Sequence, residues 1–378
     1  MIGKPIYLDY NATTPVDPEV AEAMKPFLTE IFGNPSSSHY YGFEARKAVE
    51  TAREQVASLI NCKPNEIIFT SGGTESNNFA IKGTAFKLQN NGRHIITSSI
   101  EHPAVLEVCH FLEKYGFEIT YLPVDKFGMV SVSDIEKAIK SSTILISIMH
   151  ANNEIGTLQP IEEIGILANK YKIMFHTDAA QSIGKVKLNV KETGIDLLSV
   201  AGHKFYAPKG IGALYIKEGT VLEKFMHGAN HEQNLRAGTE NLLEIVGLGK
   251  AAEISKRDFD KTLGHQKELR DKLHDKLRQY LPDIRMNGHP EKRLPNTLSI
   301  SFDGQEANHL LKKMEGIAAS AGAACHSDGV KISGVLKAIN LPENFARGTI
   351  RFSTGKFLNE KDIDRATEII IKAVNIGL

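Results

Sequence analysis

Residues 173–181 read IMFHTDAAQ, and residues 197–204 read LLSVAGHK. In each stretch a short apolar run, as long as a buried strand, precedes one charged residue, Asp178 or Lys204. An unpaired charge among apolar side chains is costly, so a shared ligand would explain both residues. Pyridoxal phosphate (PLP) needs a lysine amine for its aldehyde and an acid for its ring nitrogen. Taken singly, Asp178 also suits a helix N-cap, and Lys204 suits a solvated lysine.

Strand-like and helix-like segments alternate on both sides of this pair. The expected strands include residues 67–69, 94–97, 144–149 and 212–216, and the expected helices begin near residues 74, 103 and 161. Strands separated by helices require crossover connections, which predict an α/β fold with a mostly parallel sheet covered by helices.

The pattern of expected secondary structure changes at about residue 255. Residues 258–280 are charged and helix-forming, and they precede strand-like residues 297–301 and 349–352 and an amphipathic stretch at 360–375. This second region is α+β in character. We therefore expect a large domain of residues 15–254 and a small domain of residues 1–14 with 255–378.

Bulk composition excludes several classes of protein. The 378 residues carry 45 Lys+Arg against 45 Asp+Glu, so net charge gives no reason to expect nucleic acid or a membrane surface as a partner. No apolar run is long enough to span a membrane, and the N-terminus lacks a signal segment, so a cytoplasmic protein is expected. Cys62, Cys109 and Cys325 are far apart, which argues against a disulfide framework and a thiolate metal site. No metal is expected.

Residues 70–77, TSGGTESN, join an expected strand to an expected helix. Glycines allow close backbone approach, and a helix N-terminus offers free N–H groups, so the turn suits a phosphate. An ordinary N-cap turn is the alternative, and the motif judged alone favours it. The segment lacks the lysine of a P-loop and the spacing of a dinucleotide fingerprint.

Further motifs follow one another along the whole chain. They are YLDYNATTP at 7–15, GNPSS at 33–37, FTSGGTES at 69–76, EHPAV at 101–105, ANNEIG at 151–156, HTDAAQ at 176–181, GHK at 202–204, RAGTEN at 236–241, RLPNT at 293–297 and GAAC at 322–325. With these segments in this order, the chain resembles the NifS-like cysteine desulfurases and their selenocysteine lyase relatives. That group belongs to the class-V, fold-type-I PLP-dependent enzymes, so the resemblance implies that fold and PLP as cofactor.

The resemblance also implies residue roles. Lys204 would hold PLP covalently and shuttle the substrate's α-proton, Asp178 would pair with the ring nitrogen, and His102 would stack on the ring. The implied cofactor-binding residues are Gly73, Thr74, His102, Asn153, Asp178, Gln181, Ala201, His203, Lys204 and Thr239, the last from a second subunit of a homodimer. Asn153 and Arg351 would hold the substrate carboxylate, which suits the planar fork of an arginine.

Cys325 decides the expected reaction. Its flanks, GAA and HSDG, are small or polar, as expected of an exposed loop, whereas a buried structural cysteine is the usual alternative. We expect catalysis by Cys325, Lys204 and His102 that converts L-cysteine to L-alanine and moves the sulfur to Cys325 as a persulfide. An acceptor protein, such as an iron–sulfur scaffold or a thiolation protein, would then take the sulfur.

Three departures from the family pattern keep alternatives open. Position 201 is alanine where many desulfurases have a phosphate-binding serine, and His326 stands where threonine is common. The segment GANHEQN at 228–234 has less glycine than usual and lacks an arginine at 233. The loop around Cys325 looks like that of selenocysteine lyases, so release of selenide from L-selenocysteine is the first alternative. A class-V aminotransferase, which would not need Cys325, is the second, and a relay subunit with structural PLP is the third.

Overall fold

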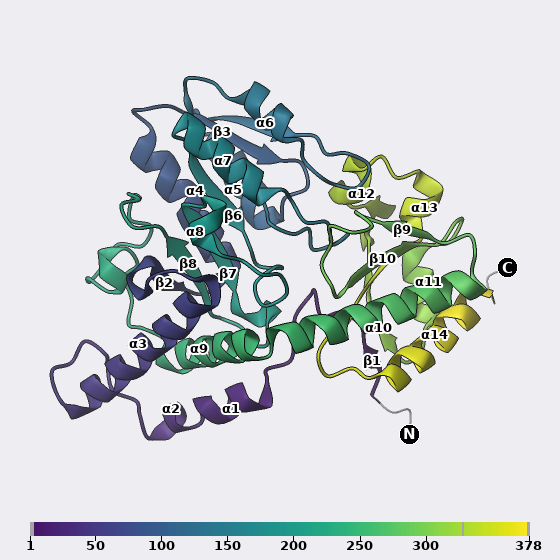
Figure 1. Cartoon of the computed structure of the whole chain (residues 1–378), viewed down its shortest axis with the longest axis horizontal. Coiled ribbons are helices and arrows are strands. Elements are labelled where there is room, and N and C mark those ends of the chain that lie inside the picture. Colours follow the sequence, from purple (N-terminus) through teal and green to yellow (C-terminus); the bar gives the residue numbers. More distant parts are fainter. Residues whose placement is uncertain (1–3, 327–328, 376–378) are drawn as a thin grey trace.

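The computed structural model describes residues 4–326 and 329–375, and its main feature is a seven-stranded sheet (Figure 1). The strands are β2 (Ile67–Thr70), β3 (His94–Ser98), β4 (Glu118–Leu122), β5 (Thr143–Ser147), β6 (Met174–Asp178), β7 (Leu197–Ala201) and β8 (Gly212–Ile216). Their order is β2-β8-β7-β6-β5-β3-β4, and β8 alone runs antiparallel to its neighbours. The prediction of a mostly parallel sheet is confirmed.

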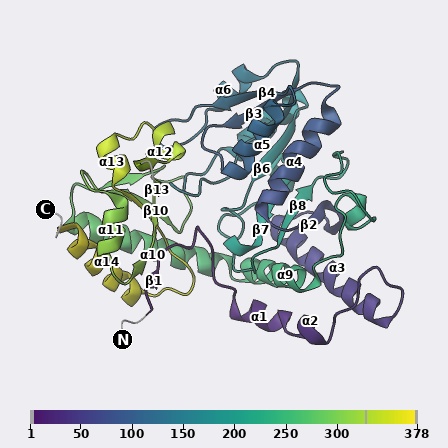
Figure 2. The ribbon, with the colours of Figure 1, turned by 180° about the vertical axis from the view of Figure 1, so that it is seen from behind.

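Helices cover both faces of this sheet (Figures 1 and 2). Residues of α3 (Tyr40–Ile60), α7 (Ile161–Tyr171) and α9 (Leu242–Arg257) share one apolar core with strand residues such as Phe175. Residues of α4 (Gly73–Leu88) and α5 (Pro103–Glu113) pack with Ile95 and Leu145 in another core. Shorter helices lie at α1 (Pro18–Met24), α2 (Pro26–Thr29), α6 (Val132–Ala138) and α8 (Val190–Thr193). Burial on both faces explains why the central strands read as continuous apolar runs.

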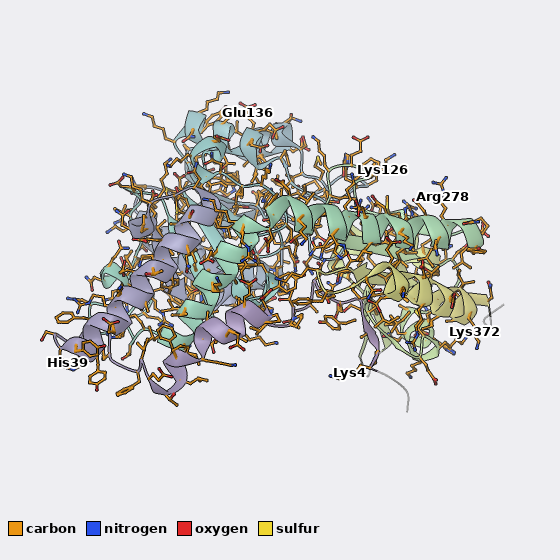
Figure 3. The ribbon with its side chains drawn as sticks, turned by 60° about the horizontal axis from the view of Figure 1, so that its bottom comes forward. Lys4, His39, Lys126, Glu136, Arg278 and Lys372 are labelled. Atoms are coloured by element: carbon orange, nitrogen blue, oxygen red, sulfur yellow. The ribbon has the colours of Figure 1, made fainter. Side chains whose placement is uncertain are left out.

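A second, antiparallel sheet lies beside the first. Its order is β12 (Ser320–Ala321), β15 (Thr349–Ser353), β10 (Thr297–Ser301) and β9 (Arg285–Asn287). The long helix α10 (Phe259–Tyr280) and the C-terminal helix α14 (Glu360–Asn375) pack against it through Leu273 and Ile370. Their opposite faces are polar, and Figure 3 shows Arg278 of α10 and Lys372 of α14 at the surface. The helical pattern in the sequence therefore reflects one apolar stripe along each helix.

The N-terminal segment packs with this second sheet rather than with the first. Strand β1 (Ile6–Tyr7) pairs with β11 (Ile317–Ala318), and Leu8 and Tyr10 join the apolar core of α10 and α14. The remaining elements are the hairpin of β13 (Ala323–His326) and β14 (Gly329–Ile332) and the helices α11 (Ala307–Lys313), α12 (Gly334–Ala338) and α13 (Glu343–Arg347). Among the described residues, no helix is both long and apolar enough to cross a membrane.

Candidate active site

One cavity gathers most of the predicted site residues. It has a volume of about 390 Å³ and lies where β6 and β7 end, beside the first residues of α4 and α5. Its lining includes Gly73, Thr74, His102, Asn153, Asp178, Gln181, Ala201, His203, Lys204 and Arg351. Because the carboxyl ends of parallel strands meet at one edge of a sheet, residues distant in sequence converge there.

Asp178 is the last residue of β6, and its buried carboxylate has a fixed orientation. Asn77 donates from Nδ2 to Asp178 Oδ2 at 2.7 Å, and the Ala180 N–H donates to Oδ1 at 2.9 Å. Strand β6 runs between β5 and β7, so the backbone that carries Asp178 is held on both sides. The arrangement presents a rigid carboxylate to a cationic group in the cavity.

Lys204 lies in a single 3₁₀ turn, η2 (Gly202–Lys204), directly after β7. Its Nζ donates to the carbonyl oxygens of Asn11 at 2.6 Å and Ala12 at 2.8 Å. Burial, reinforced by the charge of Arg351, lowers the pKa of Lys204 to about 8. A large share of this amine is therefore uncharged at slightly alkaline pH, which is the state that reacts with an aldehyde.

His102 caps the N-terminus of α5, and its ring borders the cavity. Its Nδ1 accepts a hydrogen bond from the Ala104 N–H at 3.1 Å, so the proton of the neutral ring lies on Nε2. Burial of the ring lowers the pKa of His102. The charge of Asp178 opposes this shift, and the charge of Lys204 adds to it. At neutral pH the ring therefore offers a flat apolar face and one N–H donor.

The opposite end of the cavity suits an anion. Gly72 precedes α4 with φ 146°, a conformation that favours glycine, and no side-chain cap bonds to the helix N-terminus. A Cβ on Gly73 would lie 3.2 Å from the Cβ of Ala201, so close backbone approach here depends on small residues. The ring of His203 lies 3.2 Å from Thr13 Oγ1, and burial together with the Lys204 charge lowers its pKa to about 4.

Arg351 reaches the cavity from β15 of the second sheet. Its NH2 donates to Asp9 Oδ1 at 2.7 Å and its NH1 to the Asn153 carbonyl at 3.1 Å. Its Nε is buried and has no acceptor among the described residues. The guanidinium is therefore held in place with donor capacity left for a carboxylate.

These residues fit PLP. Lys204 supplies an amine of lowered pKa, Asp178 supplies an oriented carboxylate, and the glycine turn before α4 supplies backbone N–H groups for a phosphate. The cavity is large enough for a cofactor and a small amino acid together. No group of three or more residues suited to hold a metal ion occurs in the part of the chain that the structure describes.

One predicted residue whose side chain is described, Thr239, does not line this cavity. Thr239 is exposed, on a segment outside the cavity that is tied to α4 by the Arg236–Glu75 ion pair at 2.9 Å. The same segment is anchored further back by buried Glu232, whose Oε1 lies 2.8 Å from Arg53 NH2. Thr239 therefore lies outside the cavity of its own chain.

Cys325 belongs to the hairpin of β13 and β14, with its backbone opposite Val330. Its thiol, like the other side chains of residues 323–331, lies outside the described residues. The base of the hairpin is described: the Gly322 N–H donates to the Thr349 carbonyl at 2.8 Å. Strand β12 leads into the hairpin and pairs Ser320 with Arg351, so the hairpin begins beside the cavity.

Sequence reasoning missed several residues that shape the cavity. Asn77 bonds to Asp178, Asn11 holds Lys204 through its carbonyl, and Lys185 bonds to Gln181. Asn77 lies one helical turn after Thr74, and Lys185 lies four residues after Gln181, spacings at which side chains can share a face. The sequence shows these spacings, but it does not show which face of each segment points toward the cavity.

Comparison with known proteins gives a consistent set of relatives. The aminotransferase class-V family matches residues 6–366. A cysteine desulfurase IscS of Dictyoglomus turgidum is 52% identical over 371 residues, which cover 98% of this chain and 94% of that protein. A cysteine desulfurase IscS of Methanosarcina thermophila is 49% identical over 374 residues, covering 98% and 92% of the two chains.

Solved structures agree with the sequence relatives. A NifS-like protein superposes with a TM-score of 0.93 at 37% identity, covering 98% of this chain and all of that one (100%). A structure described as SspA in complex with cysteine superposes with a TM-score of 0.80 at 40% identity, covering 93% and 99% of the two chains.

Proposed function

The chain belongs to the aminotransferase class-V family and is a PLP-dependent cysteine desulfurase, and on that premise we propose that the 390 Å³ cavity is its active site. The observation that carries this assignment is the convergence of Lys204, Asp178 and Arg351 on one cavity from two sheets. An amine, a carboxylate and a guanidinium meet there in the arrangement that PLP and an amino acid need.

Some of the cavity residues would bind the cofactor and others the substrate. Lys204 would hold the PLP aldehyde, Asp178 the ring nitrogen, Gln181 the ring oxygen, and Gly73, Thr74 and His203 the phosphate, with Thr239 of a second subunit adding to it. When bound, PLP draws electrons from the substrate's α-carbon and so eases loss of its proton. Arg351 and Asn153 orient the substrate carboxylate. Lys204, with its lowered pKa, takes the α-proton, and His102 donates from Nε2.

We assign sulfur transfer to Cys325. Its thiolate attacks the sulfur of the bound cysteine, and a new S–S bond forms as the Cβ–S bond breaks. The electron pair of the broken bond remains with the carbon, which takes up a proton and leaves as alanine. The position of Cys325 in a hairpin that begins beside Arg351 supports this role.

The relatives favour cysteine as substrate over the alternatives. Both sequence relatives described above are cysteine desulfurases, and the solved complex contains cysteine. Selenide release from selenocysteine and amino-group transfer are therefore not favoured. A sulfur-acceptor protein, such as an iron–sulfur scaffold or a thiolation protein, remains our proposal for the next carrier. We also propose a cytoplasmic location, in keeping with the unpaired Cys62 and Cys109.

We further propose that the protein is a homodimer. Five large apolar side chains cluster at the start of α3 and in the preceding segment, with exposed fractions of 64% for Leu28, 66% for Phe32, 69% for Tyr40, 49% for Tyr41 and 52% for Phe43. The rings of Phe32 and Tyr41 stack at 5.3 Å. His39, which caps α3, marks this edge of the molecule in Figure 3. Exposed apolar side chains that contact one another, as Phe32, Tyr40 and Tyr41 do, are typical of an interface.

The division into two domains also stands as a proposal. We place residues 15–254 in a PLP-binding domain and residues 1–14 with 255–378 in a smaller one that carries the Cys325 hairpin. The separate apolar cores of the two sheets support it, as does the presence of Leu8 and Tyr10 in the second core.

The pH dependence of cofactor uptake tests the assignment of Lys204. Its pKa lies near 8 rather than the ordinary 10.5, so the free amine is half formed at about pH 8 and nearly complete above about pH 9. The rate at which the apoprotein takes up PLP, followed by the visible absorption band, should rise through about pH 8 and level off above about pH 9. Lys204→Ala should lack the covalently bound band, while Lys191→Ala, at an exposed lysine, should keep it.

A rate that keeps rising to pH 10 would contradict the lowered pKa. A covalent band retained in Lys204→Ala would overturn the assignment itself.

A further inference from the structure

Lys185 is a buried lysine that the proposed chemistry does not use. It lies in the segment after β6 and is 4% exposed, although lysine is rarely buried without an acid partner. Burial lowers the pKa of Lys185 to about 7, with smaller contributions in the same direction from Lys204 and Arg351, both cations. Burying an amine beside two cations has a free-energy cost for folding, which suggests that Lys185 has a functional role.

The hydrogen bond of Lys185 leads directly to the cavity. Its Nζ donates to Gln181 Oε1 at 3.1 Å, and Gln181 is itself buried and lines the cavity. Gln181 Nε2 donates to the Asn11 carbonyl at 2.9 Å, the same oxygen that accepts from Lys204 Nζ at 2.6 Å. Lys185, Gln181, the Asn11 carbonyl and Lys204 therefore form one connected chain of hydrogen bonds.

This chain fixes which way the Gln181 amide faces. The Asn11 carbonyl can only accept, so the nitrogen of the amide must face Asn11 and its oxygen must face Lys185, whose amine has an N–H to donate whether charged or neutral. The nitrogen then faces Asn11, and of its two hydrogens one is taken by the Asn11 carbonyl. The other hydrogen remains for a ligand. If the Gln181 amide were turned over, its nitrogen would face the amine of Lys185, so that two donors would meet. Its oxygen would then face the cavity as an acceptor.

We propose that Lys185 is a positioning residue, which holds the Gln181 amide so that it donates to the ring oxygen of PLP and cannot accept from it. The proposal rests on the proposed function, since it needs PLP in this cavity. A donor without a competing acceptor favours the anionic form of that oxygen. Lys185 thus acts on the cofactor through Gln181, without contact of its own.

Three variants of the full-length protein test this role: Lys185→Met, Gln181→Ala and the double variant. Lys185→Met keeps the length and apolar character of the side chain but removes the donor. We expect the Kd of its apoprotein for PLP to rise about tenfold. The pKa of the bound cofactor, read from the pH dependence of the visible band, should shift upward. In the Gln181→Ala background, Lys185→Met should cause no further change.

The controls separate this role from a structural one. Lys187→Met changes an exposed lysine two residues away and should leave affinity and spectrum unchanged. Thermal unfolding of the Lys185→Met apoprotein should occur at the wild-type temperature or above, because a buried amine is removed. Lys185→Leu provides a second apolar replacement should the first not fold, and the same changes are expected.

Additive effects of the two substitutions, or wild-type affinity and spectrum in Lys185→Met, would overturn the proposal. Failure of the wild-type apoprotein to bind PLP would instead count against the proposed function, so the two failures are distinguishable.

Discussion

At the scale of single residues, the orientation of Asp178 depends on a neighbour from another element. Asn77 of α4 donates to Asp178 Oδ2 at 2.7 Å and is 1% exposed. A carboxylate can only accept, so this donor helps to fix the orientation of the Asp178 carboxylate in the cavity. The other carboxylate oxygen accepts from the backbone of Ala180. Asn77 therefore lines the cavity and positions the carboxylate that we propose to hold the cofactor.

Replacing Asn77 should weaken the cofactor site. Asn77→Ala removes one hydrogen bond to a charged group, and we expect the Kd for PLP to rise about tenfold or more. The control is Asn78→Ala, whose exposed side chain bonds to the Thr74 carbonyl of its own helix. Titration of each apoprotein with PLP, followed by absorbance, measures the difference. Equal affinities in the two variants would rule out the role of Asn77.

The sequence predicted part of this site at the residue scale. Asp178 and Lys204 were identifiable because each follows an apolar strand, where a charge needs a partner. Asn77 and Lys185 carry no comparable signal, since an amide on a helix or a lysine in a turn is ordinary at the surface. Their roles depend on which face of each segment packs inward, and that is decided by tertiary contacts.

At the scale of elements, prediction succeeded where burial was complete. The fully buried strands β2, β5, β7 and β8, together with β6, in which only Met174 is partly exposed, appear in the sequence as apolar runs. Strand β4 lies at the edge of the sheet with a partly exposed pattern, and sequence reasoning did not propose it. Helix α6 has seven residues and was also missed, because so short a helix shows little periodicity.

The exposed apolar segment before and within α3 gives a prediction at the same scale. Phe32 is 66% exposed and stacks on Tyr41, so a charge placed there should oppose burial against a second copy. Phe32→Glu should shift the protein from dimer to monomer, measured by sedimentation velocity at micromolar concentration. The matched control is Tyr280→Glu, at another exposed aromatic residue, at the end of α10. A wild-type monomer, or an unchanged dimer in Phe32→Glu, would contradict the proposed interface.

At the scale of the whole molecule, the site depends on the contact between two sheets. Asp178 and Lys204 come from the seven-stranded sheet, while Arg351 comes from the four-stranded one. Its partner Asp9 comes from the N-terminal segment, 342 positions earlier. The alternation of strands and helices predicted the first sheet, but not its order or the antiparallel course of β8. Strand order is set by packing between distant segments, and local pattern does not encode it.

At this scale, Cys325 comes from a hairpin that follows β12 of the second sheet, apart from the elements that carry Asp178 and Lys204. Because the hairpin of β13 and β14 begins beside Arg351, the element that we propose to accept sulfur adjoins the element that we propose to bind the substrate carboxylate. By contrast, Cys62 is half-buried, and burial raises its pKa to about 12. Cys109 is buried in the core of α4 and α5. Neither cysteine is suited to nucleophilic attack.

The most direct test measures alanine formed from L-cysteine by the wild type, Cys325→Ala and Cys62→Ala, with the mass of each protein recorded after the reaction. We expect the wild type and Cys62→Ala to form alanine and to gain the mass of one sulfur atom. Cys325→Ala should keep its PLP absorption band but form no alanine from cysteine and gain no sulfur. Full turnover of cysteine by Cys325→Ala, or turnover by the wild type of selenocysteine alone, would contradict this expectation.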